Sequence, residues 1–129
     1  MPSDPPVITK LSSRSVEETV ARLEAILDGK GVKVFAVIDH SGEAEKAGLQ
    51  LRDTKVVIFG NPKGGTPAMQ AQPLLALDLP LKVLVWADGD QTKVTYTDPA
   101  ALAARYGLEG DVVAPLAVIG DLADALVSG

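Results

Sequence analysis

The chain has 129 residues and a formal net charge of -5, with 12 lysine and arginine residues against 17 aspartate and glutamate residues. This length predicts a single domain over residues 1–129 that can bury a core without metal or disulfide support. Because the basic residues are scattered along an acidic chain, we expect no nucleic-acid partner and no binding to anionic membranes. The absence of cysteine excludes thiolate catalysis and cysteine-ligated metal, and it fits a reducing compartment.

The N-terminal residues predict a short flexible lead-in over residues 1–6. They carry neither the basic stretch nor the apolar stretch of a signal peptide. The longest apolar run, Val112 to Gly120, is far below the roughly 18 residues that a membrane-spanning helix needs. We therefore expect a cytoplasmic protein that is not embedded in a membrane.

The first half of the chain predicts three strands and two helices. Residues 7–11 favour a short strand, and Ser15 with Glu18 form a capping box that opens a helix with one apolar stripe. Residues 32–38 are rich in β-branched side chains and predict a largely buried strand, after which Ser41 caps a short helical turn. Residues 54–59 end in an almost continuous apolar run, as expected of an interior strand.

The second half predicts a hairpin between helices. Residues 81–87 and 92–97 alternate like strands around an Asp-Gly-Asp turn. Two helices are predicted to begin at a cap followed by proline, one at Thr66 and one at Asp98. A final helix is predicted over residues 114–127.

The segment from Phe59 to Gln70 is the most informative for function, because a buried strand ends there in a glycine-rich loop that opens a helix. Backbone N–H groups at a helix N-terminus, with a lysine beside them, are typical of a phosphate or carboxylate site. The candidate ligand-binding residues are Asn61, Lys63, Gly64, Gly65, Thr66 and Met69, with His40 near them. The alternative is that Thr66 caps its own helix and the glycines only satisfy turn dihedrals. The spacing matches neither a Walker loop nor a dinucleotide fingerprint.

His40 is the only histidine and follows Asp39 at the end of a predicted strand. It is interpreted either as a functional base or as a loop residue that caps a turn. One histidine without cysteine suits only a carboxylate-rich metal centre, so no metal ligand is assigned and no cofactor is specified. The chain has no nucleophile elbow and no distinctive carboxylate pair, so no catalytic residue is assigned and a non-enzymatic role is favoured.

Five segments together resemble one known family in consistent order. They are Ile38-Asp39-His40, Phe59-Gly60-Asn61-Pro62-Lys63, Thr66-Pro67-Ala68-Met69-Gln70, Lys82-Val83-Leu84-Val85-Trp86 and Tyr96-Thr97-Asp98-Pro99. Over about residues 10–110 the chain resembles the domain of unknown function 302 family. The resemblance implies an α+β fold of the TATA-binding-protein-like class, with a curved antiparallel sheet in the order β-α-β(4)-α and helices on one face. It implies no activity, and the fold likeness does not transfer DNA binding to an acidic chain.

Three functions from different classes are consistent with these features. The first is a non-enzymatic domain that binds a small anionic or amphipathic molecule at the loop of residues 61–66. The second is a homodimeric structural or protein-interaction module, and an enzyme using His40 as general base is a third reading. We expect a homodimer in either of the first two cases, because an antiparallel sheet with one helical layer leaves an edge or a face to cover.

Overall fold

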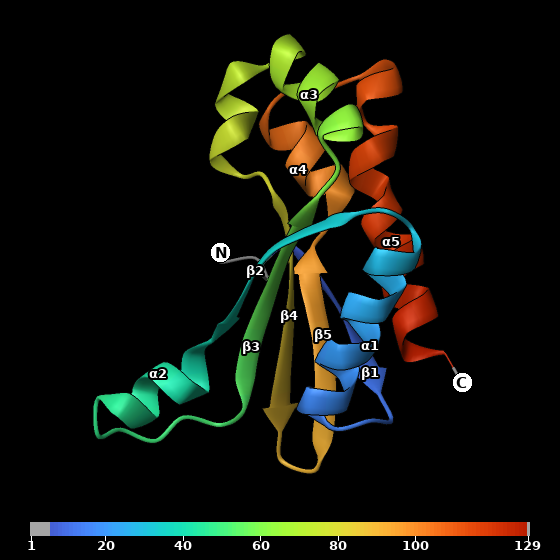
Figure 1. Cartoon of the computed structure of the whole chain (residues 1–129). Helices are drawn as coiled ribbons and strands as arrows, with labels where there is room; N and C mark the ends of the chain where they lie inside the picture. The colour runs from blue at the N-terminus through green and yellow to red at the C-terminus, as the bar shows by residue number, and fades with distance from the viewer. Residues whose placement is uncertain (1–5, 129) are drawn as a thin grey trace.

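The computed structural model describes residues 6–128 and contains five strands and five helices within that range (Figure 1). The strands are β1 (Val7–Ser12), β2 (Lys33–Asp39), β3 (Thr54–Gly60), β4 (Leu81–Asp88) and β5 (Gln91–Thr97). The helices are α1 (Val16–Gly29), α2 (His40–Lys46), α3 (Pro62–Ala71), α4 (Pro99–Arg105) and α5 (Ala114–Val127), with short 3-10 turns η1 (Pro73–Leu77) and η2 (Gly110–Val112).

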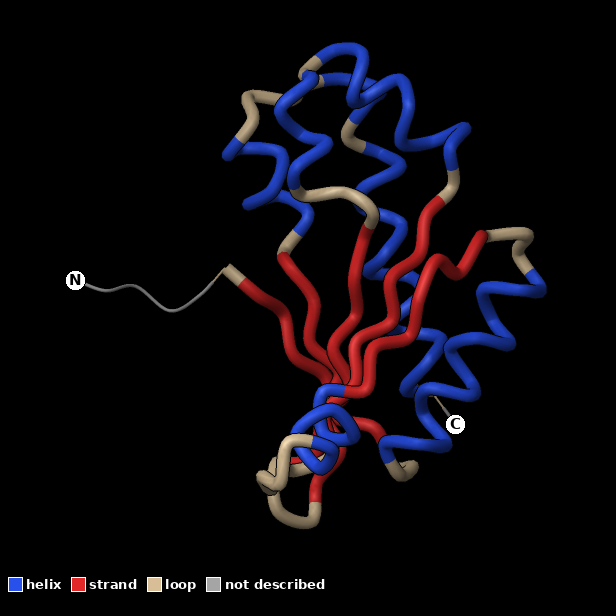
Figure 2. Tube along the Cα trace, turned by 60° about the vertical axis from the view of Figure 1, so that its left-hand side comes forward, coloured by secondary structure: helices blue, strands red, loops and turns tan. Residues whose placement is uncertain are grey.

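The strands form one antiparallel sheet in the order β1-β5-β4-β3-β2. The predicted α+β class and the order β-α-β(4)-α are confirmed, including the hairpin of β4 and β5. Figure 2 shows α1 and α5 against one face of the sheet, α3 and α4 beyond one end, and α2 at the opposite end. Residues 1–5 of the predicted lead-in lie outside the described residues.

The core lies between the sheet and the pair α1 and α5. On the inner sheet face Val57, Phe59, Val83, Val85 and Val94 are at most 1% exposed. They pack against buried leucines and isoleucine of both helices in one continuous cluster. Burial of each such side chain contributes about 1.5–3 kcal/mol, so this cluster is the main stabilising feature of the fold.

Two of the helix caps predicted from the sequence are present in the structure. The Glu18 N–H donates to Ser15 Oγ at 3.0 Å, and the Ser15 N–H donates to Glu18 Oε1 at 3.2 Å, which completes the capping box of α1. Asp98 caps α4 through the Ala100 N–H at 3.0 Å. Both caps satisfy N–H groups that a helix leaves unpaired at its start.

The prediction that residues 32–38 form a largely buried strand is wrong. β2 is an edge strand that pairs only with β3, and Phe35, Val37 and Ile38 are 47%, 39% and 36% exposed. A bulge lies between Val34 and Ala36 in its ladder with β3. A β-branched composition indicates a strand but does not distinguish the interior of a sheet from its edge.

Two predicted helix caps are also wrong. α3 begins at Pro62 rather than Pro67, and its N-cap is Asn61 rather than Thr66. α2 is capped by Asp39 rather than Ser41. Asn and Asp are as effective as Ser and Thr at the N-cap position. Glycine has a low helix propensity, so the two glycines in the first turn of α3 led to the prediction of a loop there.

The structure also bears on the length of the helices. Within residues 6–128, none is both long enough and apolar enough to span a membrane.

The core assignment predicts that Val57→Asp unfolds the protein. Val57 is fully buried in β3, and an unpaired carboxylate there costs about 4 kcal/mol or more. The matched control is Val7→Asp, because Val7 lies on edge strand β1 and is 43% exposed. Thermal denaturation should show no cooperative transition for the first variant and a nearly normal one for the second. A normal transition for Val57→Asp would contradict the core described above.

Candidate functional site

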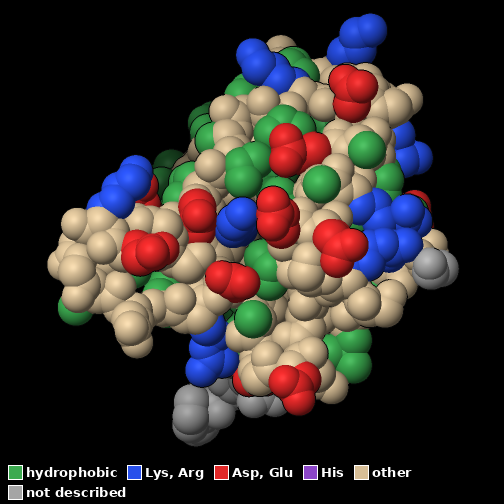
Figure 3. Space-filling model, turned by 60° about the horizontal axis from the view of Figure 1, so that its bottom comes forward, with side chains coloured by type: hydrophobic (Ala, Val, Ile, Leu, Met, Phe, Trp, Pro, Cys, Tyr) green, Lys and Arg blue, Asp and Glu red, His purple; other side chains and the backbone are tan. Residues whose placement is uncertain are grey.

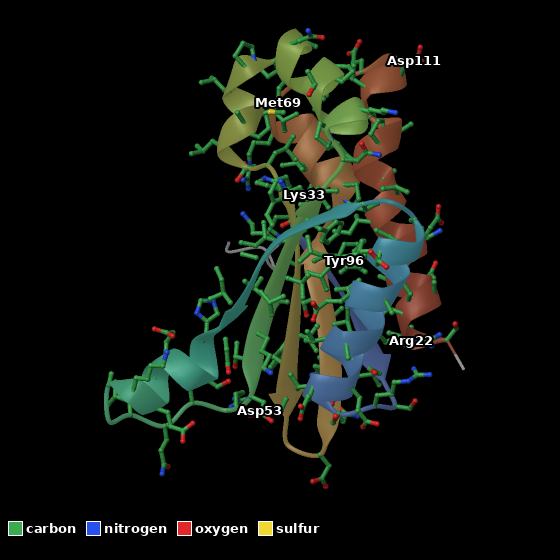
Figure 4. All side chains as sticks on the ribbon, viewed as in Figure 1. Arg22, Lys33, Asp53, Met69, Tyr96 and Asp111 are labelled. Carbon is green, nitrogen blue, oxygen red and sulfur yellow. The ribbon has the colours of Figure 1, made fainter. Side chains whose placement is uncertain are left out.

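A groove of about 740 Å³ lies at the end of the sheet where β3 leads into α3. We call it the end groove. Its apolar walls include Val32, Phe35, Phe59, Met69, Leu79 and Val118. These residues come from the start of β2, the end of β3, α3, the connection before β4, and α5. In Figure 4, the labelled residues Met69 and Asp111 lie at the end of the molecule that contains α3, and Asp53 lies at the other end.

The two glycines of α3 shape one wall of the end groove. A Cβ atom at Gly64 would lie 3.0 Å from Pro115 Cβ, so the absence of a side chain lets α3 approach α5 closely. A Cβ at Gly65 would lie 3.7 Å from Leu79 Cδ1, which is ordinary contact. Neither glycine is among the described residues with positive φ. The alternative that they satisfy turn dihedrals is therefore wrong, and close packing explains Gly64.

The N-terminal N–H groups of α3 are already paired within the helix. The Lys63 N–H donates to Asn61 Oδ1 at 3.0 Å, and the N–H groups of Gly64 and Gly65 both donate to the Asn61 carbonyl at 2.9 Å. Pro62 has no N–H group to offer. The helix start therefore lacks the set of free, converging donors that a tight phosphate site needs.

The structure brings most of the predicted ligand-binding residues together at the end groove. Asn61, Gly64, Gly65, Thr66 and Met69 all line it. Lys63 is exposed and lies outside the lining.

Sequence reasoning missed the charged residues of the groove, Lys30 and Asp111, and its apolar walls at Phe35 and Val118. These residues come from distant parts of the chain. Only the fold places them beside α3, so no local pattern could have identified them.

His40 lies at the opposite end of the sheet from α3. It follows Asp39, which pairs with Lys55 at the start of β3, whereas Gly60 at the other end of β3 pairs with Lys33. At about 3.3 Å per residue, the strand separates the two ends by roughly 20 Å. The expectation that His40 is near the glycine segment is wrong within one chain.

A second, polar cleft of about 580 Å³ lies at the His40 end, between α2 and the start of α1. Figure 3 shows acidic and basic side chains intermixed on this end of the molecule. Asp39 contributes to the lining, but its carboxylate accepts hydrogen bonds from the Ser41 hydroxyl at 2.6 Å and the Gly42 N–H at 2.9 Å. These bonds hold the pKa of Asp39 below its ordinary value. The carboxylate is thus committed to capping α2.

Among residues 6–128, no group of three or more histidine, aspartate or glutamate side chains is arranged to hold a metal ion.

A hydrogen-bonded cluster anchors the Leu79 wall of the end groove. The Tyr106 hydroxyl donates to the Asp78 carboxylate, and Arg105 Nη1 donates to it at 3.2 Å. The tyrosine bond, and secondly the arginine, hold the pKa of Asp78 below its ordinary value. The same bond raises the pKa of Tyr106. The cluster ties the residue before Leu79 to the C-terminal end of α4.

The lowered pKa of Asp78 predicts a pH-dependent effect of Tyr106→Phe. The ionised carboxylate binds the hydroxyl more strongly, so this stabilisation is fully present above the pKa of the unfolded state, near 3.8. It is lost as the pH falls through the lower pKa of the folded state. Tyr106→Phe should therefore lower the melting temperature by a few degrees at pH 7 and by less at pH 3. An equal effect at both pH values would exclude this linkage.

Comparison with known proteins identifies relatives over nearly all of the described residues. The family model described as "Domain of unknown function DUF302" matches residues 8–126. A crystal structure of an uncharacterized conserved DUF302 protein from Bacillus stearothermophilus shares the fold, with a TM-score of 0.80 and 21% identity over 95% of both chains.

The curated relatives of the chain include two proteins from Brucella species. The chain is 42% identical over 120 residues to "Fluoride-specific ion channel FluC 1" of Brucella suis biovar 1 (strain 1330), covering 91% of this chain and 47% of that protein. It is equally identical to "Fluoride-specific ion channel FluC 2" of Brucella melitensis biotype 1 (strain ATCC 23456 / CCUG 17765 / NCTC 10094 / 16M), covering 91% of this chain and 44% of that protein. The chain thus spans about half the length of these relatives. Because the family model covers nearly all of the described residues, the chain belongs to the DUF302 family.

Proposed function

We propose that this protein binds a small amphipathic molecule in the end groove. The observation that carries the proposal is the groove itself, whose volume of about 740 Å³ lies within the roughly 300–1,000 Å³ typical of small-molecule sites. Phe35 and Val118 on its walls are 47% and 45% exposed, so the chain leaves apolar surface open there. Covering that surface would provide the main driving force for binding.

The polar residues at the groove suit a single head group better than a free inorganic anion. Lys30 and Asp111 supply one charge of each sign, and Asn61 and Thr66 add an amide and a hydroxyl. The N–H groups at the start of α3 are occupied within the helix. The mixed polar residues and the occupied N–H groups therefore favour an amphipathic ligand over a simple anion.

Binding without catalysis is the simpler function for this lining. Histidine is absent from the described residues that line the groove, and His40 lies at the far end of the same chain. An enzymatic use of the groove would depend on Asp111 or Lys30 for proton transfer, since His40 of the same chain is out of reach.

A homodimer is a second, compatible proposal. The edge strand β2 exposes Phe35, Val37 and Ile38, and α2 has no buried residue. Such an edge favours pairing with another chain. Light scattering at micromolar concentration should give twice the mass of the chain, and a monomer mass alone would contradict this proposal.

The channel name of the Brucella relatives belongs to proteins of which this chain matches less than half. Fluoride conduction is therefore not proposed for this chain. Fluoride is nevertheless a useful small anion for testing the groove.

The proposal predicts that Val118→Asp weakens the binding of anilinonaphthalene sulfonate, an amphipathic fluorescent probe. A carboxylate on the apolar wall of the groove would repel the sulfonate and disfavour the aromatic rings. The matched control is Leu77→Asp, because Leu77 is 82% exposed on η1 and does not line the groove. Fluorescence titration should show at least about tenfold weaker binding for the first variant only. Equal affinity of both variants would contradict binding in the end groove.

A second prediction separates the head-group contact from simple anion binding. Lys30→Ala should weaken probe binding, because Lys30 lines the groove, whereas Lys63→Ala should not. Millimolar fluoride, phosphate and sulfate should leave the melting temperature of the wild type unchanged. If one of these anions stabilised the wild type but not Lys63→Ala, a simple anion site at Lys63 would be supported and the amphipathic ligand class would be contradicted.

A further inference from the structure

The outer edge of β2 is unpaired in the described chain. β2 is the last strand in the sheet order, so the backbone groups that point away from β3 have no strand partner. Its apolar side chains Phe35, Val37 and Ile38 are exposed. The only strand charges are Lys33 at its start and Asp39 at its end. Such an edge is a template for another strand.

The sequence of β2 is complementary to itself in an antiparallel arrangement. When a two-fold axis passes through Ala36, opposite charges meet at both ends of the strand and apolar residues meet between them. The opposed pairs are Lys33 with Asp39, Val34 with Ile38, and Phe35 with Val37. Opposite-charge and apolar cross-strand pairs both stabilise a ladder. A second copy of this chain is therefore the partner whose chemistry fits this edge.

The other edge of the sheet does not show this complementarity. An antiparallel copy of β1 about its centre would place Thr9 opposite Lys10, with no charge pair. Lys10 is already in an ion pair with Asp124 of α5. Edge protection of β2 consists of its two terminal charges and of the bulge at Phe35, next to the proposed axis, and the ladder with β3 is regular from Ala36 to Asp39.

We propose that two copies pair through β2 and that each places its His40 at the end groove of the other. In the register that opposes Asp39 to Lys33, the next residue of the partner is its His40, the first residue of α2, and the next residue of this chain is Val32, which precedes β2 and lines the groove. His40 and the α3 residues, separated by roughly 20 Å within one chain, thus meet across the two-fold axis. The imidazole completes the polar rim beside Lys30. The role of His40 at the groove rests on the proposed function, whereas the pairing through β2 does not.

The segment after β2 supports the same arrangement. α2 has no buried residue, and Leu49 and Leu51 beyond it are 65% and 47% exposed. Figure 1 shows α2 standing away from the rest of the molecule at the end opposite α3. The two-fold axis carries this segment toward the groove end of the other copy, where its apolar side chains can be covered.

Disulfide trapping tests the register directly, because the native chain has no cysteine. In an antiparallel pair, opposed Cα atoms lie about 4.5–5.5 Å apart, within the range of a disulfide. Mild oxidation of Ala36→Cys should convert most of the protein into a covalent dimer. Thr9→Cys on β1 is the matched control and should remain uncrosslinked. No dimer from Ala36→Cys, or equal crosslinking of both variants, would overturn the pairing.

A charge exchange tests the same register without oxidation. Lys33→Glu and Asp39→Lys each place like charges opposite one another in their homodimers, so each alone should be monomeric. Their mixture restores both opposite-charge pairs and should be dimeric. Circular dichroism must show that each variant is folded, because Asp39→Lys also loses the cap of α2. A mixture that stays monomeric, while both variants are folded, would overturn the proposal.

Probe titration separates this inference from the function on which it rests. His40→Ala should weaken binding of anilinonaphthalene sulfonate about fivefold in the dimer, as expected for one lost hydrogen bond, and should have no effect in the Lys33→Glu monomer. Probe binding that is insensitive to His40 in a trapped dimer would overturn the shared site but leave the groove function intact. Trapping of Ala36→Cys without any probe binding would overturn the groove function and leave the pairing intact.

Discussion

The structure depends on the burial of one face of the sheet beneath two helices. α1 and α5 cover the inner faces of β3, β4 and β5, where Val57, Val85 and Val94 are almost completely inaccessible. The helical pair does not cover β2 to the same extent, so Phe35 and Val37 remain partly exposed. The same constraint that stabilises the fold thus leaves an open strand edge and an apolar groove at its start.

The end groove is a consequence of how α3 meets α5. Gly64 permits close contact with Pro115, and a second buried cluster that includes Ala68 and Leu116 holds α3 over the end of the sheet. The glycine-rich segment therefore acts through packing rather than through free backbone donors. The glycine-rich segment contributes to the end groove indirectly, because it sets the position of the wall that α3 forms. This explains why a segment that resembles an anion loop lies beside a mostly apolar groove.

The sequence predicted the elements whose signals are local. The capping box at Ser15, the cap at Asp98 and the hairpin around Gly89 depend on neighbours in the chain, and the structure contains all three. The exposure of β2 and the position of His40 depend on strand order, which no local pattern encodes. Five of the predicted ligand-binding residues line the groove because they lie on α3 or at its N-cap. Lys30 and Asp111 could not be predicted, since only the tertiary fold brings them there.

The central claim is that apolar surface at the α3 end of the sheet, rather than the polar cleft at the α2 end, receives a ligand. The most direct measurement is a nitrogen-15 chemical-shift titration with decanoate, a simple amphipathic carboxylate. The account predicts saturable shifts of the amides of Gly60, Gly65 and Val118, which line the end groove. It predicts little change at Asp53 and Lys55, which line the polar cleft. Shifts confined to the polar cleft, or none at saturating decanoate, would contradict it.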